Sequence, residues 1–131
     1  MDVAATTRKK VGASLTGRRV LLVEDQMVIA MEIEDVLLEL GCVVVGPVGR
    51  LEAAVRLARE EALDAAILDV NLGGEKVFPV AEALQTRSIP FIFSTGYGEA
   101  ALPEKWRGLL RLDKPFRRAQ LETLLKRVSG I

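Results

Sequence analysis

The chain of 131 residues has the length of a single domain and is long enough to bury a hydrophobic core. Half of its residues are hydrophobic and 27% are charged, and no apolar run approaches the roughly 20 residues of a membrane-spanning helix. The formal net charge is zero, with one cysteine and no histidine, which excludes an internal disulfide and any imidazole base or metal ligand. Because Cys42 suits a reducing compartment and no segment resembles a signal peptide, we expect a cytoplasmic protein.

The charges are unevenly distributed along the chain. Residues 20–98 contain 13 acids and 5 bases, whereas residues 99–131 contain 4 acids and 8 bases. The basic C-terminal third could face an acidic partner, and a solvated surface explains it equally well. The basic density is too low for a nucleic-acid-binding protein, so we expect neither a nucleic-acid nor a membrane partner.

Apolar runs and turn residues predict five strands that alternate with five helices. Residues 1–17 are polar and lack periodicity, which predicts a flexible N-terminal tail before one domain at 18–131. The strands are expected at 19–24, 42–46, 64–68, 89–94 and 109–112. Helices are expected at about 26–40, 51–62 and 118–128, with a short one at 99–108. The third helix is expected after the Gly73-Gly74 turn, with Pro79 in its first turn and a buried face of Val77, Val80, Ala81 and Leu84. This alternation predicts an α/β fold with a doubly wound, five-stranded parallel sheet and helices on both faces.

Polar residues follow four of the five strands at the point where each strand ends. In chain order they are Glu24-Asp25, Asp69, Ser94-Thr95 and Asp113-Lys114. Because ligands of open α/β sheets bind at the carboxyl edge of the strands, we expect these four ends to meet. Each residue alone has a structural explanation, such as a helix N-cap for Asp25 or a turn for Asn71. The complete set favours a functional site.

The chemistry of these strand ends favours phosphoryl transfer over nucleotide binding. The first strand is followed by Glu24-Asp25 and not by the glycines that would cradle a nucleotide phosphate. Three converging carboxylates, with Asp69 as the third, require a cation, and Mg²⁺ is typically held in this way. Lys114 adds a second positive charge and Thr95 a hydroxyl donor. Together these groups could place a phosphoryl group on an aspartate.

The same residues carry a resemblance to a known family over residues 18–128. The motifs are Glu24-Asp25 after the first strand, Asp69 in ILDVNL, Thr95 in FSTG and Lys114 in LDKPF. In this order they resemble the receiver domain of bacterial two-component response regulators. The resemblance implies a flavodoxin-like fold with strand order 2-1-3-4-5.

The resemblance also implies roles for individual residues. It implies that Asp69 accepts a phosphoryl group from a phosphohistidine of a histidine kinase or histidine phosphotransfer protein. It implies that Mg²⁺ is bound by Asp25, Asp69 and the backbone carbonyl of Asn71, with Glu24 acting through water. It further implies that Lys114 binds a phosphoryl oxygen.

Two further expectations follow from the same resemblance. Thr95 is expected to move toward the phosphoryl group when it arrives. The peptide bond before Pro115 is expected to be cis, which would direct Lys114 inward.

The sequence departs from the common receiver pattern at two positions. Arg111 stands where many receivers have an aromatic switch residue, and Gly73 replaces a common proline. With PFIFSTGYG, these departures resemble the FAT GUY-type receivers, which include single-domain regulators of alphaproteobacteria. The switch candidates are therefore Thr95, Tyr97 and Arg111.

These observations predict a phosphoacceptor that signals through protein–protein interaction. Apart from its own phosphorylation and autodephosphorylation, no enzymatic activity is expected. The chain could stand alone or belong to a hybrid histidine kinase; its downstream partner is unknown, and homodimerisation remains open. One alternative is a pseudo-receiver that serves only as an interaction module. Another is an aspartyl-phosphate phosphatase, which the sequence from Glu24 to Met27 disfavours because it lacks the D-x-D-x-[TV] pattern.

Overall fold

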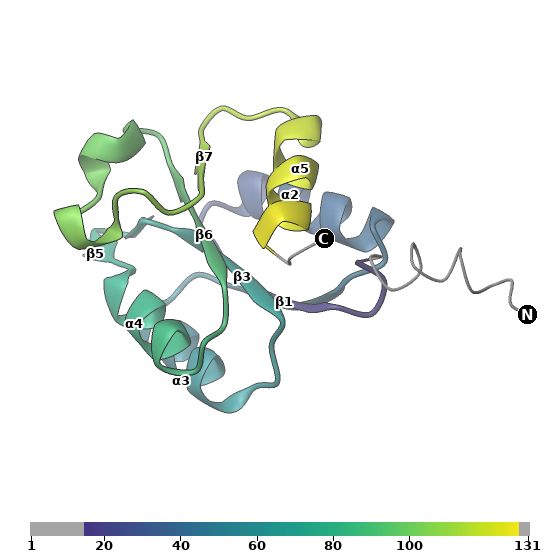
Figure 1. Ribbon diagram of the computed structural model, residues 1–131, viewed down its shortest axis with the longest axis horizontal. Coiled ribbons are helices and arrows are strands. Elements are labelled where there is room, and N and C mark those ends of the chain that lie inside the picture. The colour runs from purple at the N-terminus through teal and green to yellow at the C-terminus, as the bar shows by residue number, and fades with distance from the viewer. Residues whose placement is uncertain (1–14, 129–131) are drawn as a thin grey trace, which may run out of the picture.

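The structure is a computed structural model that describes residues 15–128, built around one five-stranded parallel sheet (Figure 1). Its strands are β1 (Arg19–Val23), β2 (Val43–Val48), β3 (Ala65–Asp69), β6 (Phe91–Thr95) and β7 (Arg111–Asp113). They lie in the order β2-β1-β3-β6-β7, and all four pairings are parallel. Counted among these strands, the order is 2-1-3-4-5, so the predicted doubly wound, flavodoxin-like fold is confirmed.

Four α-helices cover the two faces of the sheet in the described part of the chain. They are α2 (Met27–Glu39), α3 (Leu51–Glu60), α4 (Phe78–Thr86) and α5 (Arg118–Val128). Alternate residues of β1 point to opposite faces: Leu21 packs with α3 and α4, and Leu22 with α2 and α5. Figure 1 shows these two pairs of helices on either side of the strands. Both faces are therefore buried, as the continuous apolar strands predict.

The predicted fourth helix is the main difference between expectation and structure. In place of a helix at 99–108, the chain forms two 3₁₀ turns, η1 (Gly98–Ala101) and η2 (Glu104–Trp106). Pro103 stands between them in an extended conformation, with φ −58° and ψ 154°. Because proline lacks the N–H that a continuing helix requires, the segment breaks there. Within residues 15–128, four of the five predicted helices are therefore present as α-helices, and 3₁₀ turns replace the other.

Trp106 anchors this irregular segment in the hydrophobic core. Its side chain is 2% exposed and contacts Phe78, Phe91 and Phe93, with 5.8 Å between the ring centroids of Phe93 and Trp106. The contacts with Phe91 and Phe93 are edge-to-face and the one with Phe78 is stacked, and both arrangements contribute beyond the buried area alone. Trp106 is therefore a packing residue within the protomer.

A small antiparallel hairpin that the sequence analysis did not predict follows β3. It consists of β4 (Asn71–Leu72) and β5 (Glu75–Lys76), joined by Gly73 and Gly74. Both glycines have positive φ, +55° and +96°, as tight two-residue hairpin turns require. The predicted turn is present, and it shapes the chain directly after Asp69.

The second strand differs from its predicted limits and burial. It does not end at Gly46-Pro47 but continues to Val48, and its residues are partly exposed because β2 is an edge strand. Pro47 is tolerated there because an edge strand has one row of unpaired backbone groups. Gly46 has φ +109°, and a Cβ at this position would lie 2.7 Å from the carbonyl oxygen of Leu22. Only glycine fits this close approach.

Two residues before β1, Leu15 and Gly17, contact the rest of the fold. Residues 1–14 lie outside the described residues. Leu15 is 4% exposed in the core beneath α2 and α5, and the Gly17 N–H donates to the Gly41 carbonyl at 2.8 Å. Leu15 is therefore buried, whereas Thr16 and Gly17 are exposed. The flexible tail over residues 1–17 stays a prediction. Between residues 15 and 128, no helix has the length and hydropathy to cross a bilayer.

Candidate phosphoacceptor site

Three carboxylates meet at the carboxyl edge of the sheet. Glu24 and Asp25 follow β1, and Asp69 ends the neighbouring strand β3. One oxygen of each carboxylate lies within 4.8 Å of the others. Glu24 is 3% exposed and Asp69 5% exposed, whereas Asp25 is open to solvent. The structure thus brings together the three acids that the sequence placed at one edge.

Lys114 joins this cluster from the end of β7. Its Nζ donates to Glu24 Oε1 at 3.1 Å and to Asp69 Oδ1 at 3.2 Å. Its backbone N–H donates to the Thr95 carbonyl at 2.8 Å, which fixes the start of the loop, and the Lys114–Pro115 bond is cis, as the resemblance implied. The ammonium is therefore the shared counter-ion of two buried carboxylates.

Thr95 ends β6 and lines the same cleft as Asp69. Its side chain is buried, and its Oγ1 accepts the Tyr97 N–H at 3.0 Å. Because a hydroxyl can accept and donate at once, its proton remains available to a ligand in the cleft. The cleft has a volume of about 340 Å³. It is lined by Gln26, Asp69, Val70, Asn71, Lys76, Thr95, Gly96, Tyr97, Ala101 and Lys114.

The electrostatics of the site show an excess of negative charge around Asp69. Burial and the charge of Glu24 raise the pKa of Asp69 to about 7, against the opposing effect of Lys114. Burial acts to lower the pKa of Lys114, but hydrogen bonding to Glu24 and the charge of Asp69 raise it overall. Three oxygen donors with one shared ammonium form a donor set that fits a hard divalent cation such as Mg²⁺.

Asp25 does not serve as a helix cap, which was its structural explanation. The N-cap of α2 is Gln26, without a capping hydrogen bond from its side chain, and the Gln26 N–H donates to Glu24 Oε2 at 3.1 Å. The hairpin lies beside Asp25, since a Cβ on Gly73 would be 3.7 Å from Asp25 Oδ2. The Asp25 carboxylate is thus held at the site without a capping role.

The switch candidates occupy different places. Tyr97 lies at the cleft and is 78% exposed. Arg111 lies outside the cleft lining and pairs with Asp113 on the same strand, with 2.7 Å between Nε and Oδ1. Of the three candidates, Thr95 and Tyr97 are therefore placed at the cleft.

Lys76 on β5 is a charged residue of the cleft that was not predicted from the sequence. The available signal was a lysine three positions after Gly73, between the predicted turn and the buried face of the predicted third helix. Asn71, which was selected, is its cross-strand partner. The hairpin is what brings both residues to the cleft.

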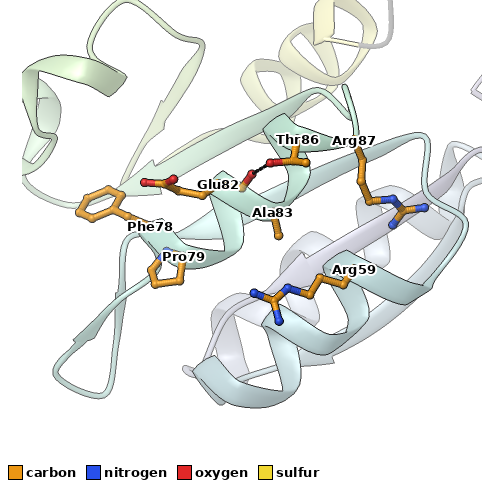
Figure 2. Close-up of a pocket in the computed structure, with 7 residues that line it drawn as sticks. All are labelled: Arg59, Phe78, Pro79, Glu82, Ala83, Thr86 and Arg87. Atoms are coloured by element: carbon orange, nitrogen blue, oxygen red, sulfur yellow. Dashed lines mark hydrogen bonds between the residues drawn. The ribbon is translucent and has the colours of Figure 1, made fainter.

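A second, larger groove lies between α3 and α4 (Figure 2) and has a volume of about 650 Å³. Arg87 at its end donates from Nη1 to the carbonyls of Ala58 and Glu61 at 2.6 and 2.8 Å. These contacts satisfy the C-terminal carbonyls of α3, which is a structural role. The groove shares no lining residue with the acidic cleft.

Comparisons with known proteins agree with this geometry. The model of the response regulator receiver domain matches residues 20–126. The transcriptional regulatory protein PdtaR of Mycobacterium tuberculosis is 32% identical over 103 residues, which cover 76% of this chain and 50% of PdtaR. The chain therefore spans about half the length of this curated relative.

Two solved structures extend the comparison. The solution structure of SdrG from Sphingomonas melonis Fr1 matches with a TM-score of 0.77 and 39% identity, over 90% of this chain and 99% of SdrG. The receiver domain of the sensor histidine kinase PA1611 from Pseudomonas aeruginosa PAO1 has a magnesium ion coordinated in its active-site cleft. It matches with a TM-score of 0.76 and 31% identity, over 88% of this chain and 100% of that domain. The chain belongs to the response regulator receiver domain family.

Proposed function

We propose that this receiver takes a phosphoryl group onto Asp69 in the presence of Mg²⁺ and signals by changing the surface it offers to other proteins. The observation that supports this most directly is the arrangement around Asp69. Its carboxylate lines the cleft, contacts the ammonium of Lys114 at 3.2 Å and lies beside Glu24 and Asp25. A carboxylate nucleophile beside a fixed cation suits phosphoryl transfer.

Several residues at the cleft have a role in this proposal. An Asp69 oxygen forms the bond to phosphorus while the bond between phosphorus and the donor's leaving atom breaks. Lys114 is placed to bind a phosphoryl oxygen, and Thr95 can donate its hydroxyl proton to another. When bound by Asp25, Asp69 and the carbonyl of Asn71, with Glu24 acting through water, Mg²⁺ would neutralise charge on the carboxylates and the phosphoryl group. No reaction on a separate metabolite is proposed.

Intact mass spectrometry after incubation with acetyl phosphate and Mg²⁺ tests this proposal. Wild-type protein should gain the mass of one phosphoryl group, and Asp69→Asn should gain none. Asp113→Asn is the matched control, because Asp113 also lies at a strand end but is exposed and paired with Arg111. An unchanged wild-type mass, under conditions that label another receiver, would refute the proposal.

The second candidate is a pseudo-receiver that binds partners without phosphorylation. The family match is compatible with both functions. The raised pKa of Asp69 favours the receiver, because an interaction module gains nothing from a buried, repelling carboxylate pair. A Mg²⁺ titration followed by NMR separates them: a receiver shows one saturable site at Asp25 and Asp69, and a pseudo-receiver shows none.

The donor we propose is a histidine kinase or a histidine phosphotransfer protein. The first turns of α2 expose three large apolar side chains, Met27, Val28 and Met31, at 75%, 73% and 56%. They follow Gln26, which lines the cleft. An apolar patch beside a reactive carboxylate fits a protein donor that must dock before transfer.

Several finer assignments belong to the same proposal. The motif PFIFSTGYG supports the FAT GUY-type subgroup, with Thr95, Tyr97 and Arg111 as switch candidates. We place the protein in the cytoplasm. The comparisons with SdrG and with the receiver domain of PA1611 are compatible with a stand-alone regulator and with a part of a hybrid kinase. A downstream protein partner and homodimerisation are tested by co-purification and by sedimentation of the phosphorylated form.

A further inference from the structure

Lys76 is a cation at the phosphoacceptor cleft for which the sequence analysis gave no role. It lies on β5, lines the cleft with Asp69 and Lys114, and is exposed. Among residues 15–128 no ion pair involves Lys76, whereas Lys114 contacts two carboxylates. Lys76 is therefore a cation at the cleft whose charge no neighbouring acid neutralises by direct contact.

The hairpin fixes the side from which Lys76 enters the cleft. Asn71 and Lys76 are directly opposite one another, as are Leu72 and Glu75. Directly opposite residues of an antiparallel pair share a face, and consecutive residues alternate between faces. Leu72 is 3% exposed and packs in the core, so Asn71 and Lys76 must lie on the other face, where both line the cleft. The position of Lys76 thus follows from the burial of Leu72.

The charge of the site shows what this lysine could contribute. An aspartyl phosphate dianion on Asp69 carries two negative charges, and Glu24 and Asp25 carry two more. Mg²⁺ and Lys114 together supply three positive charges. One negative charge is left uncompensated, and Lys76 is the remaining cationic side chain of the cleft lining.

We propose that Lys76 is a second cationic contact for the phosphoryl group on the open side of the cleft, and that it speeds phosphorylation of Asp69 by attracting the anionic donor. This inference rests on the proposed function. With acetyl phosphate, the bond between Asp69 and phosphorus forms as the bond to the acetate oxygen breaks, and acetate leaves with the electron pair. Lys76 transfers no proton in this step and acts only through its charge.

The test uses the full chain and the variants Lys76→Gln and Lys76→Arg. Lys126→Gln is the matched control, because it removes one positive charge from α5, where Lys126 pairs with Glu122. Labelling by acetyl phosphate at saturating Mg²⁺ is timed by intact mass at low and high salt. A second measurement, Mg²⁺ affinity by NMR titration without any donor, does not depend on phosphorylation.

The two measurements should change in opposite directions. At low salt, Lys76→Gln should be labelled about three- to tenfold more slowly, and the difference should shrink near 1 M salt, where the screening length is about 3 Å. The same variant should bind Mg²⁺ about twofold or more tightly, because a charge that repels the cation is gone. Lys76→Arg should behave like wild type in both measurements.

Each other outcome has a distinct meaning. If wild type, Lys76→Gln and Lys126→Gln are all labelled at the same rate at low salt, the inference is wrong and the proposed function stands. Slower labelling together with weaker Mg²⁺ binding would indicate a damaged hairpin and would also overturn the inference. If wild-type protein takes no label, the proposed function fails and this inference fails with it.

Discussion

Asp69 and Lys114, 45 residues apart in the chain, are joined by a contact of 3.2 Å between Oδ1 and Nζ. The contact links the end of β3 to the residue after β7, across the intervening strand β6. Because Lys114 also contacts the buried carboxylate of Glu24, one ammonium holds two acids that would otherwise repel. The stability of this acidic cluster therefore depends on Lys114, to which the proposed phosphoryl transfer also assigns a role.

The raised pKa of Asp69 predicts how stability depends on pH. A carboxyl whose folded-state pKa is about 7, against about 3.9 in the unfolded chain, binds its proton more tightly when folded. Its contribution is fully present below about pH 4 and is lost as the pH rises to 7. Without Mg²⁺, we expect the free energy of unfolding to fall by on the order of 4 kcal/mol through this group between pH 4 and pH 8, because each unit of pKa difference corresponds to about 1.4 kcal/mol.

Urea unfolding across this pH range, with Asp69→Asn as the reference, measures that effect. The variant lacks the titrating group, so the difference between the two proteins isolates it. Saturating Mg²⁺ should flatten the wild-type profile, because the bound cation favours the ionised form. Parallel profiles for wild type and Asp69→Asn without Mg²⁺ would contradict the assigned pKa.

Replacing Lys114 by methionine should destabilise the protein strongly. The substitution keeps most of the side-chain volume but leaves Glu24 and Asp69, both buried, without their shared cation. Removing one partner of a buried ion pair lowers the free energy of unfolding by about 3 to 5 kcal/mol. Lys105→Met is the control, because Lys105 forms only an exposed ion pair with Glu82. This variant should lose less than about 1 kcal/mol of unfolding free energy. Equal losses in the two variants, measured by urea unfolding at pH 8, would show that the Lys114 pairs do not hold the site.

Ser94→Ala should stabilise the protein. Ser94 is fully buried, and its hydroxyl has no hydrogen-bond partner among the described residues. Removing an unpaired buried hydroxyl should raise the free energy of unfolding by about 1 kcal/mol. Thr86→Ala, at a solvent-exposed helix position, should change it by less than about 0.5 kcal/mol. A lower melting temperature for Ser94→Ala would mean that the hydroxyl is bonded in solution.

The apolar patch at the start of α2 predicts a variant that separates docking from chemistry. Met31→Lys places a charge in the proposed contact with a protein donor, and it should slow transfer from phosphorylated histidine phosphotransfer domains by about tenfold or more. Labelling by acetyl phosphate should be unchanged, because Met31 does not line the cleft. Leu38→Lys, at a similar exposure of 54% but about two turns further along the helix, should have the smaller effect. If both variants slow transfer equally, the patch does not orient the donor.

The sequence predicted the position of Asp69 because two independent signals agree there. A buried apolar run ends at that residue, and the topology of parallel sheets brings the ends of such runs to one edge. The same logic placed Glu24, Asp25, Thr95 and Lys114. The proximity of these side chains was therefore predictable from the strand ends alone, and their functional roles stay predictions.

Other features depend on information that local patterns lack. The apolar run of β2 cannot reveal that this strand lies at the edge of the sheet, because that is a property of the strand order. The turn at Gly73-Gly74 does not reveal whether the residues before and after it pair as strands. The position of Lys76 at the cleft was therefore not predicted. Pro103 predicted a shortened helix. The complete replacement of this helix by 3₁₀ turns depends on the tertiary packing of Trp106, which the local sequence does not show.

The burial of the Trp106 side chain has a practical consequence. It is the one tryptophan of the chain, it packs against three phenylalanines, and it lies on the segment that follows Thr95. Indole emission depends on the polarity around the ring, so any rearrangement that lifts this segment from the core would shift the intrinsic fluorescence toward the red. Trp106 is thus an intrinsic fluorescence probe on the crossover that follows Thr95, and stopped-flow spectroscopy tests whether the proposed phosphorylation rearranges this segment.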